Sequence, residues 1–371
     1  MKWKDEFWMA RGLELARLGR FTTSPNPNVG CVIVRDNEMV GEGYHLRAGE
    51  PHAEVNALRM SGKLAKRATA YVTLEPCSHH GQTPPCADAL IAAGIARVVI
   101  AMQDPNPQVA GRGLHRLQQA GITVNHGLMM EDAEQVNLGF LKRIRKGIPY
   151  VRLKVASSLD GRTAMASGES KWITSFEARQ DVQRFRAQSS AILSSSSTVL
   201  ADDPLLTVRW DELDLETQQQ LPKTCLSQPI RVIVDSRGRV TPKHKLTRQQ
   251  GKTWLASTKP NNDTVWPKNV THLTIPAYNG GIDLVALMIT LGKRKINSVL
   301  VEAGATLTGA LLSAGVVDEL IVYMVPKLLG QDARALCILP ELTQLAKAPI
   351  FSLKEVRQIG TNLRLLLIPQ S

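Results

Sequence analysis

The first 145 residues alternate between helical and strand patterns of apolar positions. Residues 5–18 have helical spacing. The segments Val29–Val34 and Met39–Tyr44 predict a hairpin, because Asp36-Asn37 between them favours a tight turn. Beyond the hairpin, helices are predicted at residues 52–60, 85–93, 113–120 and 131–145, and strands at residues 68–74, 96–102 and 122–126. This alternation is typical of a layered α/β domain.

A stop signal separates the two halves of the chain. Lys146-Gly147-Ile148-Pro149 places a basic helix end before Gly and Pro, and a new apolar strand pattern begins at Tyr150. We therefore predict two domains, residues 1–146 and 150–371. In the second, strands are predicted at residues 150–155, 191–193, 230–235, 253–256, 298–301, 320–325 and 363–368, helices at 176–188, 284–291 and 308–314, and loops at 211–229 and 257–269.

Composition narrows the class of protein. No apolar run reaches the roughly 18 residues that a membrane span needs, and the acidic residues near the N-terminus do not suit a signal peptide, so we expect a cytoplasmic protein. Five cysteines scattered over 371 residues argue against a disulfide framework. The net charge of +12 suits nucleic acid, an anionic surface or a phosphorylated small substrate, and does not choose among them.

Two short segments carry residues that suit a zinc site. One is Pro51-His52-Ala53-Glu54, and the other is Glu75-Pro76-Cys77, with Cys86 at the start of the next predicted helix. Hydrolytic zinc takes three protein ligands and keeps a fourth position open for water. One imidazole and two thiolates, from His52, Cys77 and Cys86, would supply those three ligands.

Glu54 indicates that this zinc site is catalytic. It follows His52 by two residues, so both side chains can enter one pocket while the carboxylate stays off the metal and transfers protons. The order H-x-E, then P-C, then C is typical of zinc nucleobase deaminases, in which two residues usually separate the cysteines. Here eight residues separate them, so the insert must loop out; within it, His79 and His80 are candidates for substrate contact.

Three other interpretations remain open on these residues. His52, Cys77 and Cys86 could be unrelated core residues, as we expect for Cys31 in its apolar strand. The zinc could also stabilise a non-catalytic scaffold, although such a site has no use for a free carboxylate such as Glu54. Finally, the chain could be a tRNA or nucleic-acid base deaminase with an accessory RNA-binding half. The basic charge allows this, but the cysteine insert and the lack of an RNA-module signature disfavour it.

Longer motifs extend through both halves and resemble one family. They are Thr23-Ser24-Pro25-Asn26-Pro27-Asn28-Val29-Gly30, Pro51-His52-Ala53-Glu54-Val55, Thr73-Leu74-Glu75-Pro76-Cys77-Ser78-His79-His80-Gly81, Thr83-Pro84-Pro85-Cys86, Asp104-Pro105-Asn106-Pro107, Val109-Ala110-Gly111-Arg112-Gly113, Ser158-Leu159-Asp160-Gly161, Ser170-Lys171-Trp172-Ile173-Thr174, Asp202-Asp203-Pro204, Val301-Glu302-Ala303-Gly304 and Pro326-Lys327-Leu328-Leu329-Gly330. With these motifs the chain resembles the bacterial RibD family, the bifunctional pyrimidine deaminase–reductases of riboflavin biosynthesis.

The resemblance implies a fold, two reactions and a cofactor for each domain. The implied fold is a cytidine-deaminase-like domain followed by a dihydrofolate-reductase-like domain. The first reaction would remove the 2-amino group of a diaminopyrimidinone ribosylamine 5′-phosphate with Zn²⁺, and the second would reduce the ribosyl chain to ribityl with NADPH. The resemblance also suggests a homodimer formed through the second domain.

Several site residues follow from the resemblance, supported by local chemistry. Lys154, Asp202 and Glu302 would position and polarise the sugar for hydride transfer. The expected cofactor residues are Ala156, Trp172, Thr174, Thr198, Asp202, Ser236 and Gly304. The expected substrate residues are Asn26, Ser170, Arg186, Leu206, Arg209 and Glu302. The two arginines suit a phosphate because their guanidinium groups are planar forks. Gly304, at the start of a predicted helix, suits a phosphate as well, with help from Thr306 and Thr308.

The second half also departs from expected patterns. It has no G-x-G-x-x-G after a strand, so the residues alone do not predict a dinucleotide site. Ser194-Ser195-Ser196-Ser197 and Ala303 stand where family members often have glycine, and serine restricts the backbone more than glycine does.

Overall fold

The computed structural model describes residues 2–78, 85–107, 110–169, 173–259 and 264–370. The chain divides into two compact units, Met1–Gly147 and Ile148–Ser371. No helix within these described ranges is long and apolar enough to cross a membrane.

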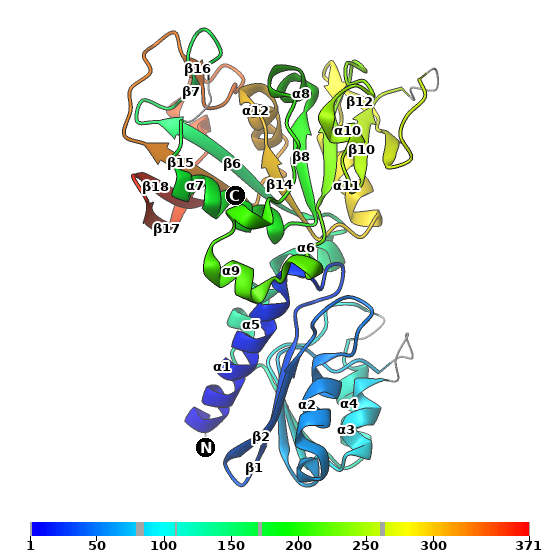
Figure 1. The fold of residues 1–371 in the computed structure, drawn as a ribbon. Helices are drawn as coiled ribbons and strands as arrows, with labels where there is room; N and C mark the ends of the chain where they lie inside the picture. Colours follow the sequence, from blue (N-terminus) through cyan, green and yellow to red (C-terminus); the bar gives the residue numbers. More distant parts are fainter. Residues whose placement is uncertain (1, 79–84, 108–109, 170–172, 260–263, 371) are drawn as a thin grey trace. The chain divides into compact units, whose positions relative to one another are not determined.

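The first unit is a five-stranded sheet covered by helices on both faces (Figure 1). The strand order is β2-β1-β3-β4-β5, with β1 antiparallel to β2 and β3, and with β3, β4 and β5 parallel. The strands are β1 (Gly30–Arg35), β2 (Glu38–Tyr44), β3 (Thr69–Val72), β4 (Arg97–Ile100) and β5 (Thr123–His126). The helices are α1 (Lys2–Leu18), α2 (Ala53–Ser61), α3 (Cys86–Ala92), α4 (Arg112–Gln119), α5 (Met130–Val136) and α6 (Leu138–Lys146).

The two faces of this sheet explain why its central strands β1, β3 and β4 are mostly apolar. Cys31 and Ile33 point into the core under α2, α3 and α4, whereas Val32 and Val34 point into the core under α1, α5 and α6. Because successive side chains of a strand face opposite sides, a strand covered on both faces needs apolar residues at every position. Cys31 is fully buried, as expected.

The second unit contains a nine-stranded sheet in the order β11-β10-β9-β8-β14-β6-β15-β18-β17. The first seven strands in this order, which begin with β11 and end with β15, are parallel to their neighbours. Strands β18 and β17 complete the other edge as antiparallel strands. The strands of this sheet are β6 (Tyr150–Ser158), β8 (Ala191–Ser195), β9 (Ile230–Val234), β10 (Thr253–Ser257), β11 (Val270–Thr274), β14 (Ser298–Glu302), β15 (Glu319–Val325), β17 (Phe351–Ile359) and β18 (Asn362–Pro369). Two small sheets pair β7 (Arg162–Ala164) with β16 (Arg334–Ala335) and β12 (Ala277–Tyr278) with β13 (Gly281–Ile282).

Helices cover both faces of the large sheet. Helices α11 (Leu284–Lys293) and α12 (Ala305–Ser313) bury leucines against one face. Helix α7 (Phe176–Ala187) packs on the other face beside β14 and β15, and α8 (Ser196–Asp202) and α10 (Lys245–Arg248) pack near β8 and β9. The parallel strands end at one edge, which is where ligands bind in open α/β sheets.

The fold confirms the predicted α/β class, with three local corrections. Residues 211–229, predicted as a loop, contain the helix α9 (Leu215–Gln220), which begins where the Asp214 side chain accepts the Thr217 backbone N–H. The helix predicted over 131–145 is divided in two at Asn137, whose φ of −123° is not helical. The helix predicted near residues 308–314 begins three residues earlier, at Ala305, directly after Gly304, which was expected to stand at the start of a helix.

Candidate functional site

Three metal-binding side chains from separate parts of the first unit converge. His52 precedes α2, Cys77 follows β3, and Cys86 is the first residue of α3. The His52 Nδ1 atom lies 3.2 Å from Cys86 Sγ and 3.7 Å from Cys77 Sγ, and the ligand atoms all lie within 4.8 Å of one another. The fold therefore brings together the three residues that the sequence predicted.

The donor chemistry of this cluster fits zinc. One imidazole nitrogen and two sulfurs form the ligand set of a catalytic zinc site, with one position left for water. The hydrogen bond from the Cys86 thiol, together with the His52 ring, lowers the pKa of Cys77 to about 4, although burial opposes the shift. The same contact raises the pKa of Cys86, and a bound metal cation would displace the proton of that thiol, because a cysteine ligand binds metal as the thiolate.

Glu54 lies beside this cluster without belonging to it. The residue stands in the first turn of α2, two positions after His52, and is only 3% exposed. Burial raises the pKa of its carboxyl, and the negative charge of Cys77 adds to the effect. A carboxyl group with a raised pKa next to a metal site is suited to accept and return protons near neutral pH.

The structure places a further histidine at this site that the sequence analysis missed. His45 is 2% exposed, and its ring lies 5.2 Å from the His52 ring. Its Nε2 atom lies 3.1 Å from the Asn26 side-chain nitrogen, and its Nδ1 atom lies 3.2 Å from the Pro51 carbonyl oxygen. Burial lowers the pKa of His45, so the ring is neutral and holds Asn26 by accepting its N–H. Its position just after the hairpin was the only sequence signal.

Glu75 lies in the same motif as Cys77 and holds the segment that leads into α4. Its buried carboxylate accepts the backbone N–H groups of Gly113 at 2.9 Å, Gly111 at 3.0 Å, Asp104 at 3.2 Å and Leu114 at 3.4 Å. These amides belong to the start of α4 and the segment before it. The carboxylate thereby joins the Cys77 segment to a second segment of the chain.

Replacement of Glu75 by Ala is expected to release this segment. Several buried N–H groups would lose their acceptor, and each such loss is costly. Amide hydrogen exchange at residues 110–114 should become about 10- to 100-fold faster. Mass spectrometry of exchanged peptides measures this, with exposed Glu38→Ala as the control. Exchange as slow as in the wild type would contradict the role assigned to Glu75.

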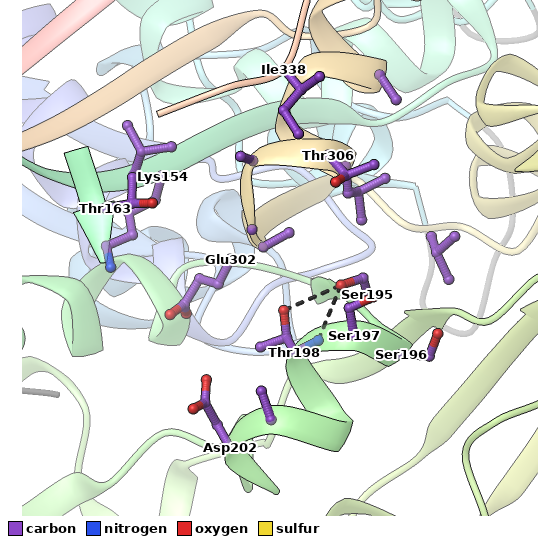
Figure 2. A pocket seen from close by; sticks show the side chains of 18 of the residues that line it. Lys154, Thr163, Ser195, Ser196, Ser197, Thr198, Asp202, Glu302, Thr306 and Ile338 are labelled. Carbon is purple, nitrogen blue, oxygen red and sulfur yellow. Dashed lines mark hydrogen bonds between the residues drawn. The ribbon is translucent and has the colours of Figure 1, made fainter. Parts of the chain in front are cut away.

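In the second unit, one cavity of about 1580 Å³ opens at the carboxyl edge of the large sheet. Apart from Thr308, every residue of the predicted reductase site that the structure describes lines it, and several of them are labelled in Figure 2. These residues are Lys154, Ala156, Thr174, Arg186, Thr198, Asp202, Leu206, Arg209, Ser236, Glu302 and Gly304. Ser170 and Trp172 lie outside the described residues, as do His79 and His80 of the first unit.

A buried group of charges lies on two adjacent strands of this cavity. Lys154 of β6 and Glu302 of β14 are register partners, and Arg186 of α7 forms a two-pronged ion pair with Glu302 at 2.6 and 2.9 Å. Burial lowers the pKa of Lys154. Burial alone would raise the pKa of Glu302, but the Arg186 guanidinium outweighs it and holds that pKa at about 2. Glu302 is therefore an anion at any working pH, and Lys154 gives up its proton more readily than a free lysine.

Of the other residues predicted to bind phosphate, Arg209 and Thr306 line the cavity and Thr308 does not. Arg209 lines the cavity but also pairs with Glu212, three residues later. Thr306 faces the cavity in Figure 2. Thr308, expected to help there, is instead fully buried in α12 and does not line the cavity. A threonine two residues after Thr306 lies on a different side of the helix, because successive helical residues turn by about 100°.

Each serine of the run Ser194–Ser197, which replaces the expected glycines, forms a hydrogen bond through its hydroxyl group. The Ser194 hydroxyl donates to the Glu302 backbone carbonyl at 2.7 Å, and the Ser195 hydroxyl caps α8 by accepting the Thr198 N–H at 3.3 Å. Ser196 and Ser197 accept from Arg239 at 2.9 and 3.0 Å. Ser195 has an ordinary extended backbone, with φ of −115° and ψ of 156°. The backbone therefore does not need glycine at this cap.

Comparison with known proteins covers both units. Residues 2–102 match the family model described as "Cytidine and deoxycytidylate deaminase zinc-binding region", and residues 149–365 match "RibD C-terminal domain". The chain is 67% identical to the riboflavin biosynthesis protein RibD of Escherichia coli, covering 98% of this chain and 99% of that protein. It is 55% identical to the protein of the same name from Haemophilus influenzae, with coverage of 99% and 98%.

Solved structures agree with these relatives. Acinetobacter baumannii RibD superposes with a TM-score of 0.91 at 47% identity and covers 100% of both chains. A diaminohydroxyphosphoribosylaminopyrimidine deaminase/5-amino-6-(5-phosphoribosylamino)uracil reductase from Thermotoga maritima superposes with a TM-score of 0.87 at 32% identity, covering 100% of this chain and 99% of that one. These matches favour the riboflavin-pathway enzyme over a nucleic-acid base deaminase. The chain belongs to the RibD family, the bifunctional deaminase–reductases of riboflavin biosynthesis, and its first unit carries that family's zinc-binding deaminase region.

Proposed function

We propose that this chain deaminates 2,5-diamino-6-(5-phosphoribosylamino)pyrimidin-4(3H)-one and then reduces the ribosyl side chain of the product to ribityl. Residues 1–146 would perform the first reaction with Zn²⁺, and residues 150–371 the second with NADPH. The observation that carries the proposal is the His52, Cys77 and Cys86 cluster with the buried, unligated Glu54 beside it. A purely structural zinc site would have no use for that carboxyl group.

His52, Cys77 and Cys86 would hold the zinc ion. When bound, zinc lowers the pKa of a water molecule so that hydroxide is available near neutral pH. Asn26, held by His45, would hydrogen-bond the pyrimidine and orient its amino-bearing carbon toward that water. The side chains of this unit thus bind and orient both reactants before any bond changes.

Glu54 would move the protons of the deamination. It accepts a proton from the attacking water and delivers it to the ring nitrogen, and it then passes a second proton to the departing amino group. The C–N bond breaks as the new C=O bond forms, so one water is consumed and one ammonia is released. Because burial raises the pKa of Glu54, the carboxyl can exist in both protonation states during one turnover.

The cavity of the second unit would hold the nicotinamide dinucleotide and the deaminated substrate together. NADPH, when bound, supplies a hydride ion and leaves as NADP⁺. The residues expected to contact it are Ala156, Thr174, Thr198, Asp202, Ser236 and Gly304, with Trp172 outside the described residues. Arg186, Leu206, Arg209 and Glu302 would contact the substrate, with Ser170 also outside that range.

Lys154 and Glu302 would act on the sugar carbon that receives the hydride. The hydride adds to the sugar carbon as the C–O bond at that carbon breaks. Lys154 then donates a proton to the sugar oxygen that this bond releases. Burial prepares Lys154 for this by lowering its pKa. Glu302 stays anionic through its pair with Arg186 and would stabilise positive charge on the sugar carbon. Asp202, at the end of α8, would help to position the same reactants.

We also propose that the active form is a homodimer formed through the second unit. It would work in the cytoplasm on a phosphorylated pyrimidine. Nucleic acid would not be a substrate, and the net charge of +12 would serve anionic small molecules instead.

A single incubation tests the proposed function. Zinc-loaded protein mixed with the diaminopyrimidine phosphate should release one ammonia per substrate without NADPH. After NADPH is added, its absorbance at 340 nm should fall by one equivalent. Protein that contains zinc but shows neither reaction would refute the proposal. Ammonia release without NADPH oxidation would restrict it to the first unit.

A further inference from the structure

An arginine outside the predicted site bonds to the serine run of the cavity. Arg239, on the turn after β9, donates from Nη2 to the hydroxyl oxygens of Ser196 at 2.9 Å and Ser197 at 3.0 Å. All three residues line the cavity, together with Arg237. The other N–H groups of the Arg239 guanidinium have no partner among the residues that the structure describes, so they are available to a ligand.

These two arginines differ from the other guanidinium groups assigned to the cavity. Arg186 pairs with Glu302, and Arg209 pairs with Glu212. In the described part of the chain, no carboxylate lies within 4.0 Å of the charged nitrogens of Arg237 or Arg239, and both residues are exposed. Two unneutralised cations beside two hydroxyl groups form a place that favours a dianion.

The one acidic side chain on this turn is directed away from the cavity. Asp235 follows β9 and is 2% exposed. Its carboxylate accepts the backbone N–H groups of Arg239 at 3.0 Å and Val240 at 2.8 Å, so it holds the turn and does not line the cavity. In dinucleotide sites, an acid at the end of a strand that bonds the ribose 2′-hydroxyl favours NADH, and an arginine there accommodates a 2′-phosphate.

The position of this cluster suits the adenosine end of a dinucleotide. Across Figure 2, Lys154, Glu302, Thr198 and Ser196 follow one another, so the Ser196 end of the serine run lies away from the Lys154–Glu302 pair, whereas Ser194 bonds to the Glu302 carbonyl. Under the proposed function, hydride transfer takes place beside Lys154 and Glu302. The nicotinamide must therefore lie there, and the adenosine ribose must lie farther along the cavity.

We propose that Arg239, with Arg237, Ser196 and Ser197, binds the 2′-phosphate of NADPH and thereby selects NADPH over NADH. This inference rests on the proposed reductase function and names the residues that set its cofactor specificity. Arg239 is held by the two hydroxyls before the cofactor arrives, so little side-chain freedom is lost on binding. With NADH the two cations would face a neutral 2′-hydroxyl, and the charge-assisted bonds would not form.

The test compares the two cofactors in the full-length, zinc-loaded protein. The measured quantity is the ratio of kcat/KM for NADPH to kcat/KM for NADH with the deaminated substrate. We expect the wild type to prefer NADPH. Arg239→Ala should lower the ratio about 10- to 100-fold, which is the effect of a charge-assisted bond to phosphate. Arg239→Lys keeps a charge but loses the fork, and should lower the ratio less. Lys293→Ala, an exposed cation of the same unit, should leave it unchanged.

A binding measurement isolates the phosphate itself. By calorimetry, the wild type should bind 2′,5′-ADP more tightly than 5′-AMP, which lacks only the 2′-phosphate, and Arg239→Ala and Arg237→Ala should each reduce that difference. An equal loss with both cofactors in Arg239→Ala and Arg239→Lys would overturn the inference, because it would indicate a structural role only. A wild type that uses both cofactors equally would also overturn it and leave the reductase assignment intact. A wild type that oxidises neither cofactor would refute the reductase assignment itself.

Discussion

Glu54→Gln is expected to abolish deamination while the protein keeps its zinc and its fold. Gln has nearly the same size as Glu but cannot accept and return a proton, so the kcat for ammonia release should fall at least about 1000-fold. This corresponds to about 4 kcal/mol of lost transition-state stabilisation. Zinc content should stay at one ion per chain, because Glu54 does not belong to the His52, Cys77 and Cys86 cluster. Elemental analysis and single-turnover ammonia release would measure the two quantities.

The controls for Glu54 separate chemistry from folding. Glu131→Gln removes an exposed carboxylate from the same unit and should retain wild-type deamination. The Glu54→Gln protein should still oxidise NADPH when it is given the deaminated intermediate, because that reaction is assigned to the other unit. Full deamination by Glu54→Gln would show that another group moves the protons. Loss of zinc from this variant would show that Glu54 is itself a ligand.

Lys154→Met is expected to abolish the reduction. Methionine fills much of the same space but cannot donate a proton, so the kcat for NADPH oxidation should fall about 100- to 10,000-fold. The Glu302 carboxylate would keep its pair with Arg186, which limits the damage to the rest of the cavity. Stopped-flow absorbance at 340 nm with the deaminated substrate would measure the rate. Deamination by the same protein should continue.

A second substitution distinguishes proton donation by Lys154 from a fixed charge. Arginine keeps the positive charge but does not deprotonate in proteins, so Lys154→Arg should be nearly as inactive as Lys154→Met. Lys293→Met removes an exposed ammonium of the same unit and should behave as the wild type. If Lys154→Arg retained most of the activity, Lys154 would act as a fixed positive charge, and another group would have to supply the proton.

Local sequence signals predicted most elements of the fold correctly. Asp36 and Asn37 adopt φ values of 52° and 66° in the turn between β1 and β2, which is the conformation that their residue types favour. Two elements that escaped prediction, α9 and β17, show no clear hydrophobic period. Helix α9 is only six residues long, too short for a helical period to show, and its capping residue and buried neighbours stabilise it. Strand β17 is largely exposed, and a register shift between Leu353 and Glu355 interrupts the alternation of its apolar and polar residues.

The chemistry of the first unit was also encoded locally. Zinc requires particular ligand types, and a proton carrier must stand near them, so His52, Glu54, Cys77 and Cys86 could be singled out without a structure. The position of His45 could not be found in this way. It depends on how the hairpin brings His45 next to Asn26 and Pro51, and no motif of the sequence records that contact.

The sequence by itself therefore indicated the α/β class and the zinc ligands, and through the family resemblance it indicated many of the residues that line the second cavity. The tertiary structure alone decided which of those residues pair with one another. Arg186 reaches Glu302 because α7 packs over β14, and Lys154 stands beside Glu302 because β6 and β14 are neighbours in the sheet. The four serines replace glycine without strain because none of them has a positive φ, and Arg239 and the Glu302 carbonyl supply partners for their hydroxyls. Residue type and spacing act over a few positions of chain, whereas charge pairing across strands depends on sheet order and register, which arise only when the whole unit folds.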